Sequence, residues 1–527
     1  MKLSYLIKDT VPLWERMFPM DSDSFPDPEI NAIHSNSRLV KPGGLFIAVK
    51  GFKTDGHDYI DDAFKRGAAA VISEKRIQEN KRVIEVKNSR KAMAAIAARF
   101  FGYPSEKMCL AGITGTNGKT TTAWILENIL KKAGLSVGVI GTLNWRYGGH
   151  VYDTPVTTPE SIDLQKMLFK MNRAGITHVI MEVSSHGIDL DRVTGCSFDM
   201  GVFTNLTQDH LDYHKTMAKY FACKKRFFTK ILTKGPKSSK ASAVINLDHE
   251  RGRKLADAVK LNTITTSTDP VKTKAIIHAD ITSSGMHEDI KGMDGKVRIA
   301  GKDFAFKSGL TGHFNLENIL CAAGAAHGLG ISPEIIIQGI EACGKVPGRL
   351  ERIGRSSRRF IFVDYSHTPD ALESILQTLK KRAPARLICV FGCGGDRDRT
   401  KRPLMGRIAA SYSDLAIVTS DNPRSEDPMA IINDILNGID RSDIVEYKAE
   451  DLKNGFNGNG FFVEPDRKTA LETALMVSRP HDIVVAAGKG HETYQILKTG
   501  TIDFDDRKVL ENALAAYGLK GETHESV

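Results

Sequence analysis

Short, uninterrupted apolar runs alternate with helical stretches through most of this 527-residue chain. Between residues 108 and 247 the runs are MCLAGIT, SVGVIGT, HVIMEVS, MGVFTNL and SAVINL, and after residue 358 they are RFIFVDY, RLICVFG, DLAIVTS and DIVVAAG. Strands that are apolar along their whole length are buried on both faces, and the intervening helices supply the crossovers of a mostly parallel sheet. The pattern therefore predicts an α/β protein with a mostly parallel sheet in each of these regions.

The chain is too long for one hydrophobic core, and its length favours about three domains. Residues 1–107 mix short apolar strands such as LFIAV and AAAVI with a stretch of helical spacing, which predicts a small N-terminal α/β domain. A central domain is predicted over 108–346, and Pro347 and Gly348 in VPGRLE mark a linker. Residues 347–527 are predicted to form a C-terminal Rossmann-like domain.

The composition restricts the compartment of the protein. No apolar run approaches the roughly 18 residues needed to cross a bilayer. The N-terminus, MKLSYLIKDTVPLWERMF, has a short apolar patch that is interrupted by Asp9, Glu15 and Arg16. These charges argue against a secretory signal. The seven cysteines are scattered without a C-x-x-C pair, as is typical of reduced thiols. We therefore expect a cytoplasmic monomer that does not bind a membrane.

The formal charge of +10 has three explanations. Basic runs such as KILTKGPKSSK and ERIGRSSRRF could contact nucleic acid, but they lack interleaved aromatic residues and any recognition-module signature. They could also form a solvated surface, or concentrate polyanionic small molecules. The motifs below favour small-molecule substrates, so no nucleic-acid partner is predicted.

The stretch CLAGITGTNGKTTTAW, residues 109–124, has the strand, Gly-rich turn and helix of a phosphate-binding loop. N–H groups at a helix start attract phosphate oxygens, while Lys119 can bridge phosphates and the Thr120 hydroxyl can ligate Mg²⁺. The spacing departs from G-x-x-x-x-G-K-[ST], because Ile113 stands at the first glycine position. The predicted nucleotide contacts are Gly115, Thr116, Asn117, Gly118, Lys119, Thr120 and Thr121.

Other charged residues follow the central strands. Glu182 comes directly after HVIM, where sites of open α/β sheets lie, so it can complete a Mg²⁺ shell begun by Thr120; otherwise it is a surface acid at a strand end. His210 and His214 have an i, i+4 spacing that suggests zinc, but no third ligand accompanies them. Taken alone, Lys224 is one charge on a solvated helix face.

GTNGKTT resembles the ATP loop of the Mur ligases and folylpolyglutamate synthetases, which join an amine to a carboxylate through an acyl phosphate and have this shorter loop. The resemblance to the Mur ligases covers nearly the whole chain. It is carried, in the family's order, by NSRLVKPGGLFIAVKG, EVSSHGIDLDR, TNLTQDHLDYH, GHFNLENILCA, PGRLE, DYSHTPDAL, GCGGDRDRTKRP, SDNPRSEDP and AGKGHETYQ. It implies that the three domains bind, in chain order, a UDP-linked substrate, ATP and an amino acid. Asn36 stands where the family usually has Asp.

The resemblance also implies residue roles. Lys224 matches the lysine that the family carbamylates with CO₂, and with Thr120, Glu182 and His210 it would surround Mg²⁺. The catalytic set that it implies is Lys119, Glu182, His210 and Lys224, with Asn318, Arg349 and Asp364 around ATP. The implied contacts to the UDP-linked substrate are Ser37, Arg38, Thr157, Thr158, Ser184 and Arg192. Thr157 and Thr158 could also cap a helix beginning at Pro159.

Polar loops follow the C-terminal strands and should meet at one edge of the sheet. Members of the family add either L-lysine or meso-diaminopimelate, which carries one more carboxylate, and an intact DNPR is the diaminopimelate signature. Arginine pairs bidentately with carboxylates, so Arg424 would hold the extra carboxylate and Glu492 the distal ammonium; the alternative is a surface arginine after a turn. The implied contacts are Arg397, Asp421, Asn422, Pro423, Arg424, Gly488 and Glu492.

The resemblance thus implies an ATP-dependent amide ligase that adds meso-diaminopimelate to UDP-N-acetylmuramoyl-L-alanyl-D-glutamate in peptidoglycan precursor synthesis. Two alternatives stay open at this point. A folylpolyglutamate synthetase would leave DNPR and the N-terminal domain unexplained. A nucleotide-dependent switch or nucleic-acid-binding ATPase would hydrolyse ATP without any peptide substrate.

Overall fold

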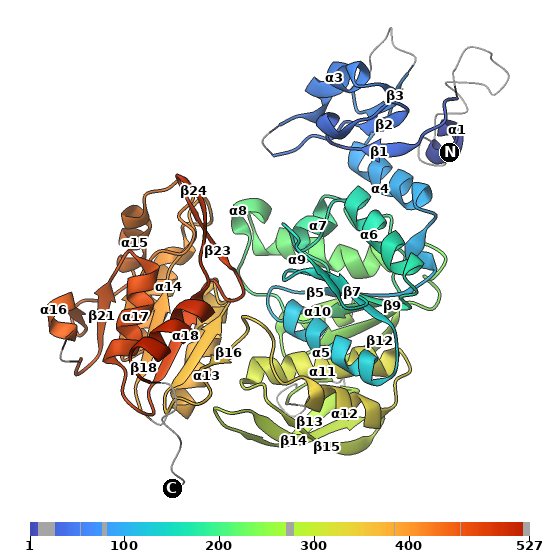
Figure 1. Cartoon of the computed structure of the whole chain (residues 1–527). Coiled ribbons are helices and arrows are strands. Elements are labelled where there is room, and N and C mark those ends of the chain that lie inside the picture. Colours follow the sequence, from blue (N-terminus) through green and yellow to red (C-terminus); the bar gives the residue numbers. More distant parts are fainter. Residues whose placement is uncertain are drawn as a thin grey trace.

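The computed structural model describes residues 1–8, 27–52, 54–75, 82–269, 279–383, 385–453 and 455–519. These residues form lobes built around sheets of 4, 11 and 7 strands, with a separate 2-stranded ribbon (Figure 1). Within these ranges, no helix combines the length and apolar character that a membrane span requires. Asp9, Glu15 and Arg16 of the N-terminal patch lie outside the described residues.

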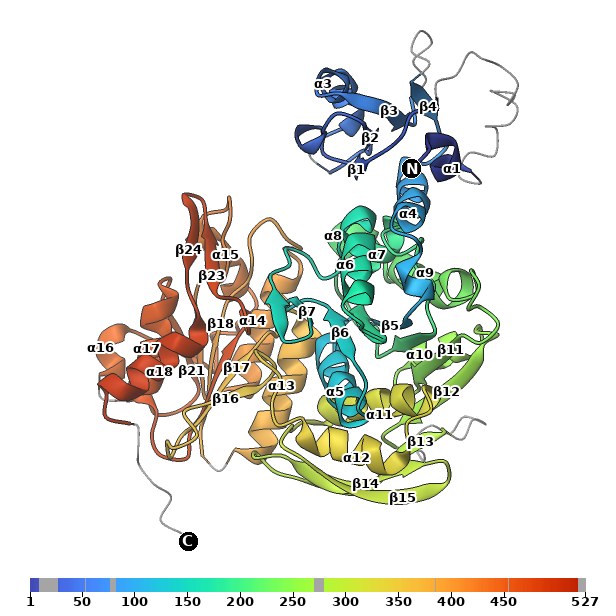
Figure 2. The ribbon, with the colours of Figure 1, turned by 45° about the vertical axis from the view of Figure 1, so that its right-hand side comes forward.

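The N-terminal lobe is a parallel sheet in the order β1-β2-β3-β4. Its strands are Ala32–His34, Gly44–Ile47, Ala68–Ser73 and Val83–Glu85, and its helical segments are α1 (Leu3–Ile7), η1 (Ser37–Leu39), η2 (Gly56–Tyr59), α3 (Ile60–Lys65) and α4 (Ser89–Phe100). The apolar faces of α1 and α4 bury one side of this sheet. α4 also packs on α6 of the central lobe and so joins the two lobes (Figures 1 and 2).

The central sheet has the order β15-β14-β13-β12-β11-β10-β5-β9-β6-β7-β8. Its strands are β5 (Cys109–Thr114), β6 (Val137–Ile140), β7 (Trp145–Tyr147), β8 (His150–Tyr152), β9 (His178–Glu182), β10 (Met200–Phe203), β11 (Ser242–Asn246), β12 (Asn262–Ser267), β13 (Ile281–Glu288), β14 (Met293–Ile299) and β15 (Lys302–Ser308). The strands from β13 to β6 are parallel, and antiparallel strands extend both edges. The apolar runs therefore form the parallel sheet that their pattern predicts.

Helices cover both faces of this sheet. Side chains of β5 alternate between two cores, with Leu110 on one face and Ala111 and Ile113 on the other. The second face is covered by α5 (Lys119–Lys132), α11 (His313–Gly328) and α12 (Pro333–Ala342). The first is covered mainly by α6 (Ser161–Arg173), α7 (Ser185–Asp189), α9 (Met217–Arg226), the π-helical η4 (Phe227–Ile231) and α10 (Glu250–Ala256), with η3 (Pro104–Glu106) and α8 (Leu211–His214) beside them.

The C-terminal sheet has the order β16-β17-β22-β18-β19-β21-β20 and is parallel except for β16. Its strands are β16 (Glu351–Ile353), β17 (Phe360–Asp364), β18 (Leu387–Phe391), β19 (Leu415–Val418), β20 (Val445–Tyr447), β21 (Gly460–Val463) and β22 (Ile483–Ala487); β23 (Tyr494–Leu497) and β24 (Gly500–Asp503) form the ribbon. One face packs on α13 (Pro369–Arg382), α14 (Lys401–Tyr412) and α15 (Pro428–Leu436), the other on α16 (Ala449–Leu452), α17 (Arg467–Val477) and α18 (Asp506–Ala516). The predicted three-domain α/β class is confirmed.

Candidate active site

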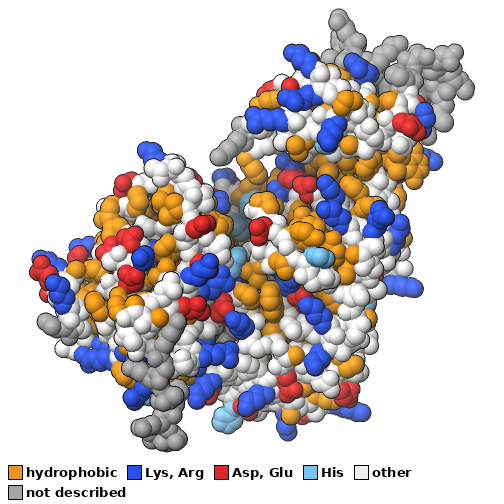
Figure 3. Space-filling view, in the orientation of Figure 1, with side chains coloured by type: hydrophobic (Ala, Val, Ile, Leu, Met, Phe, Trp, Pro, Cys, Tyr) orange, Lys and Arg blue, Asp and Glu red, His pale blue; other side chains and the backbone are white. Residues whose placement is uncertain are grey.

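A cavity of about 250 Å³ lies between the central and C-terminal lobes, and we call it the interlobe cavity. Figure 3 shows the surface hollowed between the two lobes. The loop after β5, the ends of β6 and β9 and the start of α11 form its central wall, and β17 and α13 form the opposite wall. Of the residues predicted from sequence, those lining it are Thr116, Asn117, Gly118, Lys119, Thr120, Thr121, Thr157, Glu182, Ser184, His210, Asn318, Arg349 and Asp364.

The glycines of the loop after β5 are required by close packing. A Cβ on Gly115 would lie 1.9 Å from Oγ1 of Thr204, and a Cβ on Gly118 would lie 2.1 Å from Oδ1 of Asn318. Gly118 also has a φ of +85° directly before the first residue of α5. The loop is thus fixed between β10 and α11, with the first turn of α5 lining the cavity, and a helix start of this kind attracts phosphate oxygens.

Lys119 lies folded over this loop. Its Nζ donates hydrogen bonds to the carbonyl oxygens of Gly115, at 3.1 Å, and Thr116, at 2.8 Å. Desolvation lowers the pKa of Lys119, and the neighbouring Glu182 carboxylate opposes this shift. A phosphate group would offer the ammonium stronger, charged acceptors than the two carbonyls do.

Glu182 joins the loop to the next strand end. Its Oε2 accepts hydrogen bonds from Thr120 Oγ1, at 3.0 Å, and from Thr142 Oγ1, at 2.8 Å, while its Oε1 accepts one from the Thr142 N–H at 3.0 Å. The side chain is only 2% exposed, so the alternative of a surface acid is wrong. Carboxylate and hydroxyl oxygens at one point are ligands that Mg²⁺ prefers, so this pair fits the predicted metal.

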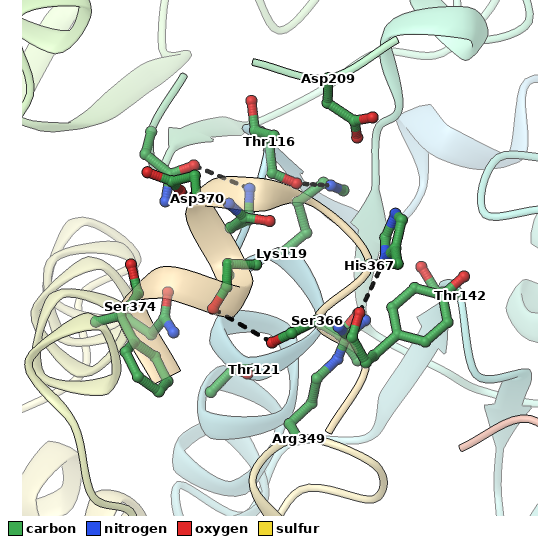
Figure 4. Close-up of a pocket in the computed structure, with 18 of the residues that line it drawn as sticks. Thr116, Lys119, Thr121, Thr142, Asp209, Arg349, Ser366, His367, Asp370 and Ser374 are labelled. Atoms are coloured by element: carbon green, nitrogen blue, oxygen red, sulfur yellow. Dashed lines mark hydrogen bonds between the residues drawn. The ribbon is translucent and has the colours of Figure 1, made fainter. Parts of the chain in front are cut away.

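Contacts cross the cavity between the lobes. Arg349, from the linker, donates to Thr120 Oγ1 at 3.2 Å, and Asn117 donates to Oδ2 of Asp370 at 3.1 Å. Figure 4 shows Lys119, Arg349 and Asp370 around the same space. Asp364 lines the cavity but is mostly buried, and it accepts a hydrogen bond from the Leu350 N–H at 2.6 Å, which fixes the linker to the end of β17.

Lys224 is buried behind the loop and does not line the cavity. Only 1% of it is exposed, so the solvated-helix-face alternative is wrong. Its Nζ donates to the Gly115 carbonyl at 2.9 Å and lies 4.9 Å from the centre of the Tyr220 ring. Burial, reinforced by the charge of Lys119, holds the pKa of Lys224 well below its ordinary value.

His210 lies among aromatic rings at the edge of the cavity. Its ring centre is 5.0 Å from that of His186, its Nε2 is 3.3 Å from Oδ2 of Asp209, and burial lowers its pKa to about 3. Within the part of the chain that the structure describes, His210 and His214 do not belong to a zinc-type cluster. Across the described ranges, the side chains grouped closely enough to hold a metal are Asp248, His313 and Glu317.

The residues predicted for the UDP-linked substrate are divided between two lobes. Thr157 and Ser184 line the interlobe cavity, and Arg192 donates to the Thr158 carbonyl at 2.9 Å and pairs with Glu160 at 2.8 Å. Ser37 and Arg38 lie in η1 of the N-terminal lobe, where Ser37 is buried and Arg38 exposed.

The helix-cap alternative for Thr157 and Thr158 is wrong. α6 begins at Ser161 with Glu160 at its N-cap. Thr158 instead donates to the Glu182 carbonyl at 3.0 Å and accepts a hydrogen bond from the Ser184 N–H at 2.9 Å, so it joins its own segment to the end of β9.

The loops after β18, β19 and β22 meet at one edge of the C-terminal sheet, as these neighbouring parallel strands require. Asn422 donates to Oε2 of Glu492 at 2.8 Å, and Arg424 donates to the Gly395 carbonyl at 2.7 Å. A Cβ on Gly394 would lie 2.9 Å from Nη1 of Arg424. The remaining predicted contacts in these loops are Arg397, which is exposed, Asp421 and Pro423, which are buried, and Gly488, which packs against Asp421. None of these loop residues lines the interlobe cavity.

Two buried cations support these loops and were not predicted. Lys489 is fully buried and contacts Oε2 of Glu492 at 3.0 Å, while burial, reinforced by Asp421, raises the pKa of Glu492. Arg467 donates to the Ala487 carbonyl at 3.0 Å and to Asp506 at 2.7 Å, and so connects the end of β22 to α18. Lys489 lies inside the GKGHE motif, but no sequence signal marks Arg467.

The cavity wall contains further residues that the sequence analysis did not name. Asp209, His367 and Asp370 line it, together with Thr142, Asn205, His249, Phe314 and Glu317. Burial, reinforced by Lys401, lowers the pKa of His367 to about 4, so its ring is neutral at neutral pH. DYSHTPD contains two of these residues, and the signal that could have found them is their place after the strand RFIFVDY.

A phosphate loop on a parallel sheet, facing a second α/β lobe across a cavity, defines a class: enzymes that hold a nucleotide between two domains. Models of the Mur ligase family match each lobe: Mur ligase family, catalytic domain, over residues 29–101; Mur ligase middle domain over 113–326; and Mur ligase, glutamate ligase domain, over 348–490. The chain belongs to the Mur ligase family, and it is an ATP-dependent ligase.

Individual relatives match nearly the full chain. The UDP-N-acetylmuramoyl-L-alanyl-D-glutamate--2,6-diaminopimelate ligase of Geobacter metallireducens is 45% identical over 94% of this chain and 96% of its own. The ligase of the same name from Trichormus variabilis is 42% identical over 98% of this chain and 99% of its own. A solved structure of a ligase with this name is 31% identical, with a TM-score of 0.66, over 96% of this chain and 99% of that chain.

Proposed function

We propose that this ligase adds meso-2,6-diaminopimelate to UDP-N-acetylmuramoyl-L-alanyl-D-glutamate, in peptidoglycan precursor synthesis. The observation that carries the proposal is the 45% identity, over nearly the full length of both chains, to a ligase of that name. The intact DNPR loop, with Arg424 and Glu492 brought to one sheet edge, supports the choice of amino acid. A folylpolyglutamate synthetase would not account for the match of residues 29–101 to a Mur ligase domain.

The reaction has two steps. The γ-carboxylate of the D-glutamyl residue attacks the γ-phosphorus of ATP, which forms an acyl phosphate and releases ADP. The amine of diaminopimelate then attacks the acyl carbon, so that an amide forms and inorganic phosphate and a proton leave. No protein nucleophile is needed, and catalysis consists of positioning and charge stabilisation.

Residues of the interlobe cavity fit this chemistry. Lys119 and the first turn of α5 would bind the phosphates, while Asn318, Arg349 and Asp364 would surround the rest of ATP. Thr120 and Glu182, 3.0 Å apart, would hold Mg²⁺, with His210 and a carbamate on Lys224 assisting; the metal would neutralise phosphate charge.

The proposal extends to the organisation of the protein. Domains 1–107, 108–346 and 347–527 would bind the UDP-linked substrate, ATP and the amino acid, respectively. Because these substrates are held by different lobes, closure of the lobes would assemble the reacting groups and exclude water. We further propose that the enzyme works as a cytoplasmic monomer on small-molecule substrates, without nucleic acid or membrane.

Phosphate release tests the proposed function. The purified protein should release phosphate from ATP when both UDP-N-acetylmuramoyl-L-alanyl-D-glutamate and meso-diaminopimelate are present, and the amide product should appear in equal amount. Omitting either substrate should stop release. Phosphate release that is independent of both would instead indicate an ATPase switch and contradict the proposal.

Lys224→Ala should be nearly inactive, and short-chain carboxylates should partly restore turnover. Burial lowers the pKa of Lys224, which favours the neutral amine, the form that reacts with CO₂ to give an anionic carbamate. Added carboxylate would replace the missing oxygen ligands. The measurement is turnover with and without added carboxylate, and wild type depleted of bicarbonate should resemble the variant.

Lys225→Ala is the matched control, because Lys225 is the next residue of α9 and is only half-buried. It should keep wild-type activity. The proposal for Lys224 fails if an electron-density map of the nucleotide-bound, bicarbonate-replete enzyme shows an unmodified ammonium.

A further inference from the structure

A second cavity, of about 340 Å³, lies beside the linker, and we call it the linker cavity. Its walls come from the turn after β13, the end of β15, the segment after α12 and the hairpin of β16 and β17. Its volume falls within the roughly 300–1,000 Å³ of small-molecule sites. Arg349 lines both cavities, but no other residue proposed above for substrate or metal lines this one.

The linker cavity is strongly basic. Its described lining includes five cations and no acidic residue: Lys291, Lys345, Arg349, Arg352 and Arg355. Lys345 is paired with Glu351 at 3.1 Å, whereas Lys291, Arg352 and Arg355 have no carboxylate partner among the residues described. Nearby Glu288 is already bound by Arg382 and by the hydroxyl of Thr311. The positive charge around the cavity is therefore largely unpaired.

Two of these guanidinium groups also hold a buried donor that has no acceptor. Nε of Arg349 and Nε of Arg352 are buried without a hydrogen-bond partner in the described structure. Arg352 stacks on the Phe360 ring, 4.8 Å from its centre, and burial, reinforced by Arg355, lowers its pKa. Buried donors are normally satisfied, so this arrangement favours an anionic occupant that supplies acceptors.

Apart from the cations, the hydroxyl residue Thr311 and two glycines, the lining is apolar. Leu310, Leu350 and Phe362 contribute aliphatic and aromatic surface beside the cations. A bare phosphate ion would leave this surface uncovered, whereas an organic phosphate would cover it. Guanidinium groups bind carboxylate and phosphate oxygens bidentately. A phosphate monoester carries about −1.5 to −2 charges at neutral pH, so it compensates more of the unpaired positive charge than a single carboxylate does.

We propose that the linker cavity binds a phosphate monoester with an apolar body, and that this ligand acts on the interlobe cavity through Arg349. Arg349 holds Thr120 at 3.2 Å in the interlobe cavity and lines the linker cavity as well. A ligand that draws this guanidinium away from Thr120 weakens ATP binding, and by linkage ATP weakens binding of the ligand.

Calorimetric titration with naphthyl phosphate tests the site. The double variant Lys291→Ala/Arg355→Ala removes two cations of the cavity and touches none of the residues proposed for catalysis. The matched control is Arg358→Ala, because Arg358 is exposed in the same hairpin and lines neither cavity. The melting temperature of each protein is measured as well, and the affinities are compared only between proteins whose melting temperatures are equal.

Wild type and Arg358→Ala should bind naphthyl phosphate with the same affinity, and the double variant should bind it at least tenfold more weakly. Uncharged naphthol should not bind, inorganic phosphate should bind more weakly, and a non-hydrolysable ATP analogue should reduce the affinity for naphthyl phosphate. Equal affinity in all three proteins, or no saturable binding to wild type, would overturn the assignment. So would loss of ligase turnover in the double variant when no naphthyl phosphate is present. Because the titration needs no peptide substrate, its outcome is independent of the proposed function.

Discussion

Lys119→Ala is expected to abolish turnover, with a fall in kcat of at least ~10²-fold, as for other preorganised groups removed from a transition state. Lys119 is the cation that lies on the phosphate loop, where its ammonium now contacts two loop carbonyls. In phosphoryl transfer this charge offsets the charge that develops on the transferred group. The measurement is phosphate release with all three substrates present.

Lys132→Ala provides the comparison, since Lys132 is an exposed lysine of the same helix. It should leave both kcat and thermal stability unchanged. Activity of Lys119→Ala within tenfold of wild type would show that this loop does not bind ATP.

Selectivity for meso-diaminopimelate over L-lysine is expected to reach roughly 10⁴-fold in kcat/KM, as in sites built around one polar contact. Arg424 is half-buried, with its guanidinium against the Gly395 carbonyl. When lysine binds, the guanidinium of Arg424 has no carboxylate partner. The resulting loss of binding free energy can exceed ~3 kcal/mol. Comparable kcat/KM values for the two amino acids would overturn the assignment and leave DNPR as a structural turn.

Arg424→Ala should therefore raise the KM for diaminopimelate severely and leave the KM values for ATP and the UDP-dipeptide near those of wild type. Arg407→Ala, an exposed arginine on α14 of the same lobe, should change none of the three. If Arg424→Ala changed all three KM values together, the arginine would instead be needed for the lobe as a whole.

Much of the fold could be predicted because its signals are local. Apolar runs such as HVIM mark buried strands, and the parallel order places Glu182 at a strand end beside the loop of Thr120. The burial of Lys224 could not be predicted in this way. Its helix segment has lysines at adjacent positions, and only the packing of α9 against the loop after β5 determines which of them is buried.

Contacts between lobes were beyond the reach of sequence reasoning for a related reason. Asn117 and Asp370 lie 253 positions apart, and their hydrogen bond depends on how two separately folded lobes meet. The same applies to the linker cavity, whose cations come from the turn after β13, the segment after α12, the linker and the hairpin of β16 and β17. Sequence patterns report the environment along one element, whereas such sites depend on the placement of whole elements.

The buried pair of Arg467 and Asp506 has a consequence for the integrity of the proposed amino-acid site. Both side chains are fully buried, and the arginine also holds the carbonyl at the end of β22, directly before the GKGHE loop. Removing one partner of such a pair leaves a charge in the interior without compensation. If α18 separated from the lobe, Arg467 would lose its anion and the loop carrying Glu492 would lose its anchor. In the proposed site, recognition of the incoming amino acid would therefore depend on α18, a helix that lies outside the loops proposed to bind it.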